Sequence, residues 1–558
     1  MIPPFLIAKK LADEELDSLF NKFLELRNPV ISPEIDKPIK YDEDYEKCGL
    51  ELVNSLVFNF EQLTDEQQLL LRPLLQRPVT TTSIITPGGY FKVHYDETGP
   101  NSPGYDINLL ADALDSTYRY EIEFLGYTFP PGDSAVNPGQ PSNDYGGDNR
   151  YDVYIGNLGG GVYGYTQFET EVEPGSSRYT SYMHIDNDFV GYYTTGINAA
   201  RVTVAHEFHH AIQGGNYIFR DEDSYFYEIT STAMEEFVFD DVNDYYAYIP
   251  TYFNNPETPL PSTNGYSTAT WNIFLQQHFN DYNIIKRQWE LMPSTRAMNA
   301  ISISLFEYES SFAREFNRYA IWMYFTNYRS IPGSYFEEAE NYPLVQPTVV
   351  VQFTPPSKHL DMSSKAAAQS FINFFVPGSN DSLIAIVTNG DVQSAINESG
   401  NIFDFEYTLY SDSSSGDRYL TPNYSSDFVA NNPSFWSVSE ILNNLVVRED
   451  DNTITPSQNK FEYAYPSPFY YNKSYLFGSS IFIPYNADLG EPVNFNVYTS
   501  AMELVYRNNE TIKFLPDEQV GVIWNVTDNN SVKLASGVYI YVVQNGDDVV
   551  KGKVVIFN

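Results

Sequence analysis

Apolar residues recur every three or four positions in the N-terminal part of the chain, which is the period of a helix packed on one side. This pattern predicts helices over residues 9–27 and 50–76. Within the second stretch, Thr64 and Gln67 form the pattern of a capping box, and Pro73 ends or kinks the helix. We therefore expect a helical region over residues 1–84, which is either a prosegment or a supporting layer.

Residues 85–346 mix helical and strand periods. The strands expected here lie at residues 90–95, 151–155 and 180–185. Helical spacing returns over residues 105–125 and 198–335, and the glycine-rich stretch 156–164 is expected to be a flexible loop. The mixture predicts an α+β domain.

Beyond residue 347 the period changes to short alternating runs separated by turn residues. The runs at 371–376 and 383–387 predict a β-rich domain over residues 347–460. In the last region, residues 461–558, two alternating runs flank a turn at 546–548, which predicts a terminal hairpin in a β-sandwich.

Composition and charge narrow the classes of function. A chain of 558 residues is long enough for several domains. It carries 73 acidic against 32 basic residues, a net charge of -41, which disfavours binding to nucleic acid. One cysteine, Cys48, allows no intramolecular disulfide and no cysteine-rich zinc module.

The sequence gives two indications about membranes and export. No apolar stretch approaches the roughly 18 residues that span a bilayer, so we expect no transmembrane segment. Lys9 and Lys10 follow the apolar run at residues 1–8, whereas a signal peptide places its basic residues first. A signal peptide is therefore not visible at this start.

The candidate chemistry lies in the run His206-Glu207-Phe208-His209-His210. His206 and His210 are four positions apart, so on a helix both imidazoles project from one face and can share a zinc ion. Glu207 stands beside the first ligand, where it can accept a proton from a zinc-activated water. His209 points elsewhere, and we expect a core or supporting role for it.

A third ligand is expected from the helical run that follows. Glu228 comes 18 positions after His210, and Glu235 is seven positions further on the same face. We favour Glu228 as the ligand, with Glu235 hydrogen-bonded to a ligand imidazole, and leave open the reverse assignment.

Two further groups are weaker candidates. Tyr266 opens a helix-like run and could donate a hydrogen bond to a reaction oxyanion. Asp186 and Asp188 could bind a structural Ca²⁺ ion, although without a ligand loop a capped turn is the better interpretation.

These motifs resemble the gluzincins, zinc peptidases with a His-Glu-x-x-His helix and a downstream glutamate ligand. Residues 85–345 more closely resemble a family of secreted bacterial metallopeptidases first catalogued from a myxobacterium. The segments that carry the resemblance are Asp152–Ile155, Thr180–Phe189, Val202–Gln213 and Met234–Tyr245. It implies that His206, His210 and Glu228 bind zinc, that Glu207 is the general base, and that Tyr266 corresponds loosely to an aminopeptidase tyrosine.

The last hundred residues resemble the Ig-like domain shared by flagellar hook-capping proteins and type IX sorting domains. The matching pieces are Tyr465–Phe469, Trp524–Asn530 and Ala535–Tyr539. This resemblance implies a secreted or cell-surface protein and contact with secretion machinery or the cell surface.

Taken together, the sequence predicts a multidomain protein in which a zincin-like α+β metallopeptidase domain precedes Ig-like β-sandwich domains. The expected activity is hydrolysis of peptide bonds in a protein or peptide substrate, as an endopeptidase. The alternative is a non-catalytic cell-surface adhesion or binding protein that retains the metallopeptidase-like domain.

Overall fold

The computed structural model divides the chain into two compact units. It describes residues 11–27, 46–133, 146–159, 161–352, 357–375, 382–396, 402–411, 418–424, 430–437, 464, 467, 469–471, 480–487, 490–499, 502–514, 520–529, 532–546 and 548–557. The first unit comprises residues up to 254 together with 260–295, and the second comprises 255–259 together with 296–558. The run with Lys9 and Lys10 and most of the Tyr465–Phe469 motif lie outside the described residues.

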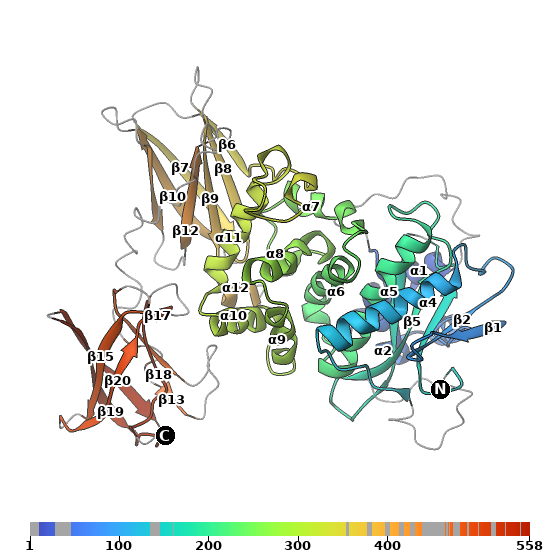
Figure 1. The fold of residues 1–558 in the computed structure, drawn as a ribbon, viewed down its shortest axis with the longest axis horizontal. Helices are drawn as coiled ribbons and strands as arrows, with labels where there is room; N and C mark the ends of the chain where they lie inside the picture. The colour runs from blue at the N-terminus through green and yellow to red at the C-terminus, as the bar shows by residue number, and fades with distance from the viewer. Residues whose placement is uncertain are drawn as a thin grey trace. The chain divides into compact units, whose positions relative to one another are not determined.

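A five-stranded sheet forms the centre of the first unit (Figure 1). Its order is β1-β2-β3-β5-β4, with β2, β3 and β5 parallel and β1 and β4 antiparallel to their neighbours. Every residue of β3 and β5 is buried, as expected for inner strands covered on both faces. The strands are β1 (Thr82–Ile85), β2 (Phe91–Tyr95), β3 (Tyr151–Gly156), β4 (Gly164–Glu171) and β5 (Tyr179–Asp186).

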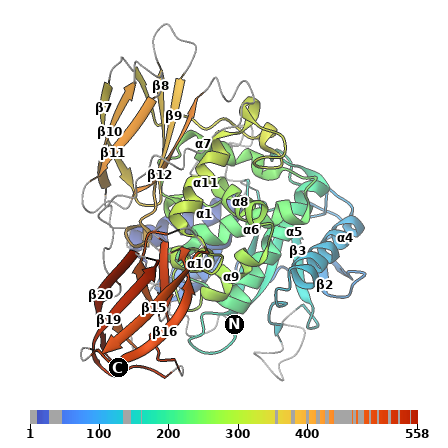
Figure 2. The same cartoon turned by 60° about the vertical axis from the view of Figure 1, so that its left-hand side comes forward.

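Helices pack on this sheet and on one another (Figure 2). The helix α5 contacts β4 and β5, and it also packs against α4 and α6. The helices of this layer are α4 (Ile107–Tyr118), η2 (Arg119–Phe124), α5 (Gly196–Ile212), η5 (Gln213–Tyr217), η6 (Asp221–Asp223), α6 (Ser224–Val238), η7 (Asp244–Ala247), α7 (Ile249–Asn254), η8 (Leu260–Ser262), η9 (Tyr266–Thr268), α8 (Thr270–Phe279) and α9 (Asn283–Leu291).

The N-terminal helices have an apolar cluster of their own, which extends onto the sheet domain. They are α1 (Asp13–Arg27), α2 (Leu50–Phe58), η1 (Phe60–Gln62) and α3 (Asp65–Leu71). Leu52, Val53 and Leu56 of α2 pack with Val162 and Tyr165, which lie before and at the start of β4. The Thr64–Gln67 capping box is present, and the single helix expected over 50–76 is interrupted at 59–63.

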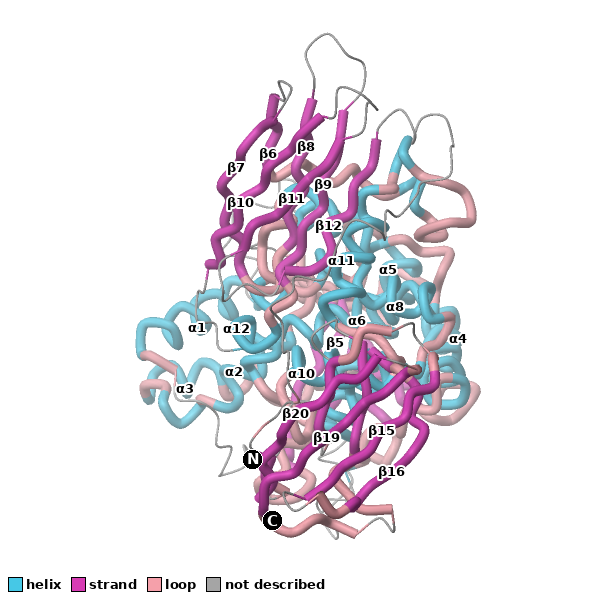
Figure 3. Tube along the Cα trace, turned by 90° about the vertical axis from the view of Figure 1, so that its left-hand side faces the viewer, coloured by secondary structure: helices cyan, strands magenta, loops and turns pink. Residues whose placement is uncertain are grey.

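The second unit begins with helices and continues as two sheets. In Figure 3 its strands are the long magenta tubes, and α11 packs against β9 and β12. The sheets have the orders β11-β10-β7 and β12-β9-β8-β6. The elements are α10 (Ala297–Glu307), α11 (Phe312–Tyr324), η10 (Asn327–Arg329), η11 (Ala339–Asn341), β6 (Val349–Gln352), β7 (Ser357–Lys365), β8 (Gln369–Phe375), β9 (Ser382–Asn389), α12 (Val392–Ile396), β10 (Ile402–Ser411), β11 (Arg418–Tyr424) and β12 (Ala430–Ser437).

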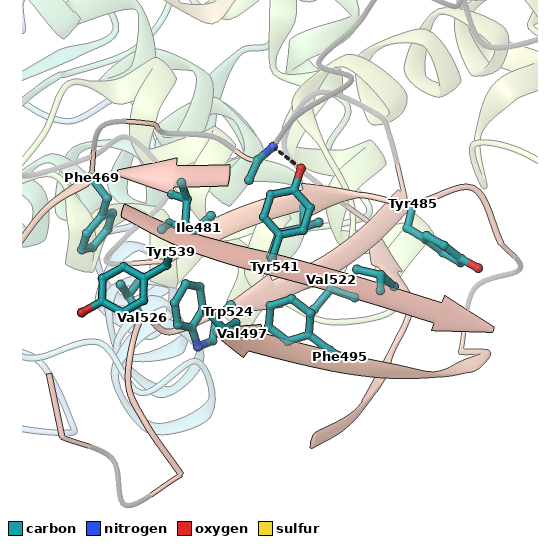
Figure 4. Packing of buried hydrophobic residues seen from close by; sticks show 14 of the residues in the cluster. Phe469, Ile481, Tyr485, Phe495, Val497, Val522, Trp524, Val526, Tyr539 and Tyr541 are labelled. Atoms are coloured by element: carbon teal, nitrogen blue, oxygen red, sulfur yellow. Dashed lines mark hydrogen bonds between the residues drawn. The ribbon is translucent and has the colours of Figure 1, made fainter. Parts of the chain in front are cut away.

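The C-terminal part of this unit has two sheets that share one apolar core, drawn in Figure 4. Phe495 and Tyr541 come from the larger sheet, Val522 and Trp524 from the smaller, and the Tyr541 hydroxyl accepts a hydrogen bond from the Ala464 amide. The sheet orders are β13-β20-β19-β15-β16 and β14-β18-β17. The strands are β13 (Phe469–Tyr470), β14 (Ile481–Pro484), β15 (Pro492–Thr499), β16 (Leu504–Thr511), β17 (Lys513–Phe514), β18 (Val520–Trp524), β19 (Gly537–Asn545) and β20 (Asp548–Phe557).

The coarse expectations hold: the chain is mixed α/β with several sheets, including sheets in a C-terminal β region. The terminal hairpin is confirmed, with Asn545 opposite Asp548 at its turn. Within the five-stranded sheet, β1 and β4 were not predicted, and the glycine-rich loop ends where β4 begins at Gly164. Among the described residues, no helix combines the length and apolar character needed to cross a membrane.

Candidate metal centre

The helix α5 carries the His-Glu-x-x-His run and is buried over its C-terminal three turns. His206 and Glu207 are each 1% exposed and His210 is fully buried. The helix ends at Ile212 and the chain turns through the two glycines of η5. The next helix, α6, then packs along α5, which brings its carboxylates to the two imidazoles.

The two imidazoles face one point through their Nε2 atoms, which are 3.0 Å apart. Their Nδ1 atoms face acceptors: Glu235 Oε1 lies 2.8 Å from Nδ1 of His206, and Gln213 Oε1 lies 2.8 Å from Nδ1 of His210. Each Nδ1–H therefore has a partner that fixes the orientation of its ring.

Glu228 supplies a carboxylate at the same point. Its Oε2 atom lies 3.0 Å from Nε2 of His206 and 3.4 Å from Nε2 of His210. Burial by itself would raise the pKa of Glu228, but the His210 and His206 rings outweigh it and lower the pKa to about 2. Glu228 is therefore an anion in the folded protein.

The carboxylates of Glu228 and Glu235 in turn shift the pKa of His206. Burial would lower the pKa of this imidazole, but Glu228 and Glu235 outweigh it and raise the pKa to about 9. The point where the donor atoms meet thus attracts positive charge, either a proton or a metal ion.

Cys48 is a fourth donor that the sequence did not indicate. One donor atom from each of Cys48, His206, His210 and Glu228 lies within 4.8 Å of all the others, and all four residues are buried. A tetrahedral zinc ion holds nitrogen, oxygen and sulfur donors roughly 3.3–3.6 Å apart, and two imidazoles, a carboxylate and a thiol are donors that it accepts. The group could therefore hold a metal ion such as zinc, and among the described residues no other group of this kind is found.

Glu207 lies beside this donor group with its side chain held in place. The Thr166 hydroxyl donates to Oε2 of Glu207 at 2.8 Å, from strand β4. Burial raises the pKa of Glu207, an effect that His210 and His206 oppose. A carboxylate of this kind is suited to accepting and returning a proton.

Behind His206 a chain of buried ionic contacts leads away from the donor group. Lys47 Nζ lies 2.5 Å from Glu235 Oε2 and 2.6 Å from Asp244 Oδ2, with all three side chains buried. Tyr163 and Tyr248 donate their hydroxyl protons to Asp244, each at 3.0 Å. Glu235 is therefore fixed by Lys47 on one side while it orients His206 on the other.

The remaining predicted residues lie in different surroundings. The Tyr266 ring centre is 6.2 Å from that of His206, and its hydroxyl accepts a hydrogen bond from the Cys48 amide at 3.1 Å. His209 is directed away and pairs with Glu121 at 2.8 Å. The Asp186 carboxylate accepts from the amides of Leu158, Asp188 and Phe189, so it caps a turn.

The structure thus brings together His206, Glu207, His210, Glu228 and, behind them, Glu235. Sequence reasoning missed Cys48 and its neighbour Lys47. A lone cysteine far from the histidines in the sequence has no motif, so no local signal was available. The acidic pair on α6, by contrast, had the helical spacing that placed both carboxylates on one face.

Comparisons with known proteins add little to this geometry. No protein-family model and no curated protein matches the chain. Part of it is similar to PorZ, a surface component of the type-IX secretion system of Porphyromonas gingivalis, at 12% identity and a TM-score of 0.14, over 35% of this chain and 39% of that one. Part is similar to the neural ectodermal development factor IMP-L2, at 10% identity and a TM-score of 0.10, over 38% of this chain and 90% of that one. At these TM-scores neither similarity carries an argument, so the peptidase family stays a prediction.

Proposed function

We propose that the chain is a zinc-dependent peptidase that hydrolyses peptide bonds in a protein or peptide substrate. The observation that carries the proposal is the convergence of the His206 and His210 Nε2 atoms with Glu228 Oε2, beside the carboxylate of Glu207. This donor set, with Glu207 beside it, resembles that of the gluzincins, and the resemblance supports the proposal. His206, His210 and Glu228 would hold the ion.

When bound, zinc supplies Lewis-acid chemistry: it makes water more acidic and polarises a carbonyl group. Glu207 accepts a proton from the attacking water as the new C–O bond forms. It then delivers this proton to the nitrogen as the C–N bond breaks, so the products are a carboxylate and an amine. Thr166 holds one oxygen of Glu207 during both transfers. We further propose that the Tyr266 hydroxyl donates to the oxyanion when Cys48 no longer engages it.

Substitution of Glu207 by Gln tests the proposal, because Gln cannot accept the proton. We expect cleavage of casein or gelatin to fall by about 10²–10⁴-fold while one equivalent of zinc is retained. Glu121→Gln is the matched control, since Glu121 is also buried but pairs with His209, away from the donor group. Equal cleavage by Glu207→Gln and the parent chain would refute the mechanism.

Separate substitutions assign the carboxylates of α6. We expect Glu228→Ala to lower zinc affinity more than Glu235→Ala, because Glu235 faces the Nδ1 atom of His206 rather than the shared point. Loss of a carboxylate that orients a ligand imidazole lowers metal affinity by about 10–100-fold. The zinc content of each variant after dialysis against increasing concentrations of a chelator measures the two affinities. The opposite ranking would make Glu235 the ligand.

One observation favours a second candidate function. With Cys48 included, the site has four protein donors, and closed four-donor sites are typical of structural zinc. A surface adhesion or binding protein that retains a metallopeptidase-like domain would have such a site. In that case zinc would bind stoichiometrically and no variant would cleave protein.

We also propose that the protein is secreted or held at the cell surface, with the C-terminal sandwich as the part that meets secretion machinery or the surface. The support is the resemblance of the last hundred residues to sorting domains. Detection of the chain in the culture medium or on intact cells tests this proposal, and its confinement to the cytosol would refute it.

A further inference from the structure

The outer edge of β4 is covered by the segment that contains Cys48. The Tyr163 amide donates to Lys47 O at 2.8 Å, and the Gly49 amide donates to Gly164 O at 2.8 Å. Cys48 and Gly164 form a parallel bridge. Residues 47–49 therefore run along the start of the edge strand as a short added strand.

The helix that follows continues this cover with a side chain. Asn54 of α2 donates through Nδ2 to Thr166 O at 2.8 Å and accepts through Oδ1 from the Phe168 amide at 2.8 Å. One side-chain amide thus pairs with the strand as a peptide group would. Together, residues 47–54 occupy backbone groups at position 163, just before β4, and at positions 164, 166 and 168 within it.

An exposed sheet edge is a common binding place for an extended peptide, which adds to it as a further strand. In this chain the edge beside Glu207 belongs to β4, the strand whose Thr166 holds that carboxylate. The covering segment therefore lies where an extended substrate would pair.

The same segment brings its thiol to the donor group. Cys48 is 3% exposed, and its sulfur accepts a hydrogen bond from the Leu50 amide at 3.3 Å, which fixes its direction. The His206 and His210 Nε2 atoms, both buried, are aimed at the point that this sulfur approaches. The Cys48 amide meanwhile donates a hydrogen bond to the hydroxyl of Tyr266.

From this juxtaposition we infer that Cys48 is the fourth ligand of the proposed zinc site and that residues 47–54 hold the site closed to substrate. The inference rests on the proposed function and adds its regulation. A catalytic zinc keeps one position open, and here the Cys48 thiolate would occupy it. The chain with this segment in place is a form of low activity, and activity rises when the segment leaves β4.

The ligand is tested on the full chain loaded with Co²⁺ in place of zinc. A cobalt–thiolate bond gives a charge-transfer absorption in the near ultraviolet, and this chain has a single cysteine, so any such band reports on Cys48. We expect the band in the parent and its loss in Cys48→Ser, with one equivalent of metal still bound. Absence of the band in the parent would overturn the inference.

Thiol reactivity gives a second reading that does not depend on a variant. We expect one equivalent of zinc to slow modification of Cys48 by a thiol reagent by more than about tenfold, because a metal-bound sulfur is not free to attack. Equal rates with and without zinc would contradict ligation.

Latency is tested with short peptides, which need less of the covered edge than a protein does. We expect Cys48→Ser to cleave them at least about tenfold faster than the parent, and Cys48→Ser combined with Glu207→Gln to be inactive. Equal rates in the parent and Cys48→Ser would overturn the closing role. A cobalt band that depends on Cys48, with no cleavage by any variant, would leave the ligand assigned and refute the peptidase proposal instead.

Discussion

Lys47 is the cation that two fully buried carboxylates share, so its removal is expected to be costly. Substitution by Met keeps the length of the side chain but leaves Glu235 and Asp244 without their cation, with both carboxylates at 0% exposure. Breaking a buried ion pair by removing one partner costs about 3–5 kcal/mol, because an uncompensated charge stays buried. In a unit of about 290 residues this corresponds to a fall of roughly 5–8 °C in the unfolding temperature.

The chain offers a matched control for this experiment. Lys22 forms an ion pair with Glu46 at the same distance of 2.5 Å, but the side chains are 43% and 42% exposed. We expect Lys22→Met to change stability by about 0–1 kcal/mol, since an exposed pair is solvated and screened. Thermal unfolding followed by circular dichroism at pH 7 compares the two variants. A Lys47→Met variant no less stable than Lys22→Met would refute the reasoning that the buried triad stabilises the unit.

The pH dependence of the same contacts follows from two pKa shifts. Burial opposes both, but Lys47 lowers the pKa of Asp244, and Asp244 with Glu235 raises the pKa of Lys47 above 10.5. Asp244, whose pKa is lowered, stabilises the fold above the pKa that it has in the unfolded chain, and this effect is lost as the pH falls. Lys47, whose pKa is raised, stabilises the fold below the pKa that it has in the unfolded chain, and this effect is lost only at strongly alkaline pH. The stability difference between the parent and Lys47→Met should therefore be largest between about pH 4 and pH 10.

Two further predictions concern other parts of the first unit. Gly265 has a φ of 84°, and a Cβ there would lie 2.5 Å from Glu228 Cβ and from Tyr225 O, so we expect Gly265→Ala to displace Glu228 and lower zinc affinity. Gly175→Ala, at a φ of 80° with nothing within 4 Å, should cost only about 1–2 kcal/mol of backbone strain and leave zinc affinity unchanged; equal zinc affinity in both variants would contradict this account. Burial, together with Glu169 and Asp152, outweighs Arg77 and raises the pKa of Asp133 to about 7. Between about pH 4 and pH 7 the Asp133 carboxyl is therefore protonated in the folded state and ionised in the unfolded state. Its contribution to the stability of the fold is lost as the pH rises over this range. The free energy of unfolding, measured across this pH range, should fall less in Asp133→Asn than in the parent. An equal fall in both would contradict the raised pKa of Asp133.

The parts of the molecule predicted from sequence are those whose signals are local. His206 and His210 are one helical turn apart, and their chemistry is visible in five consecutive residues. Thr64 and Gln67, or the two runs of the terminal hairpin, are likewise close neighbours. Glu228 and Glu235 were found because helical spacing relates them to each other, although the structure was needed to show which imidazole atom each one faces.

The parts that were missed depend on long-range pairing. Lys47 and Glu235 are 188 positions apart, and the Cys48 amide and the Tyr266 hydroxyl are 218 apart. No period or motif connects such residues. Strand β4 was missed because its first residues follow a glycine-rich loop, and its place at the edge of the sheet is set by β5 on one side and residues 47–54 on the other.

The pairing of Asn54 with β4 also has a consequence for self-association. An uncovered edge strand presents free amide and carbonyl groups to any neighbouring chain, which is a starting point for intermolecular sheet growth. In this protein the Asn54 side chain occupies Thr166 O and the Phe168 amide, and the apolar face of α2 covers Tyr165. A shortened chain that begins at the central sheet would expose this edge, and we expect it to form aggregates unless a peptide or another protein takes the place of α2.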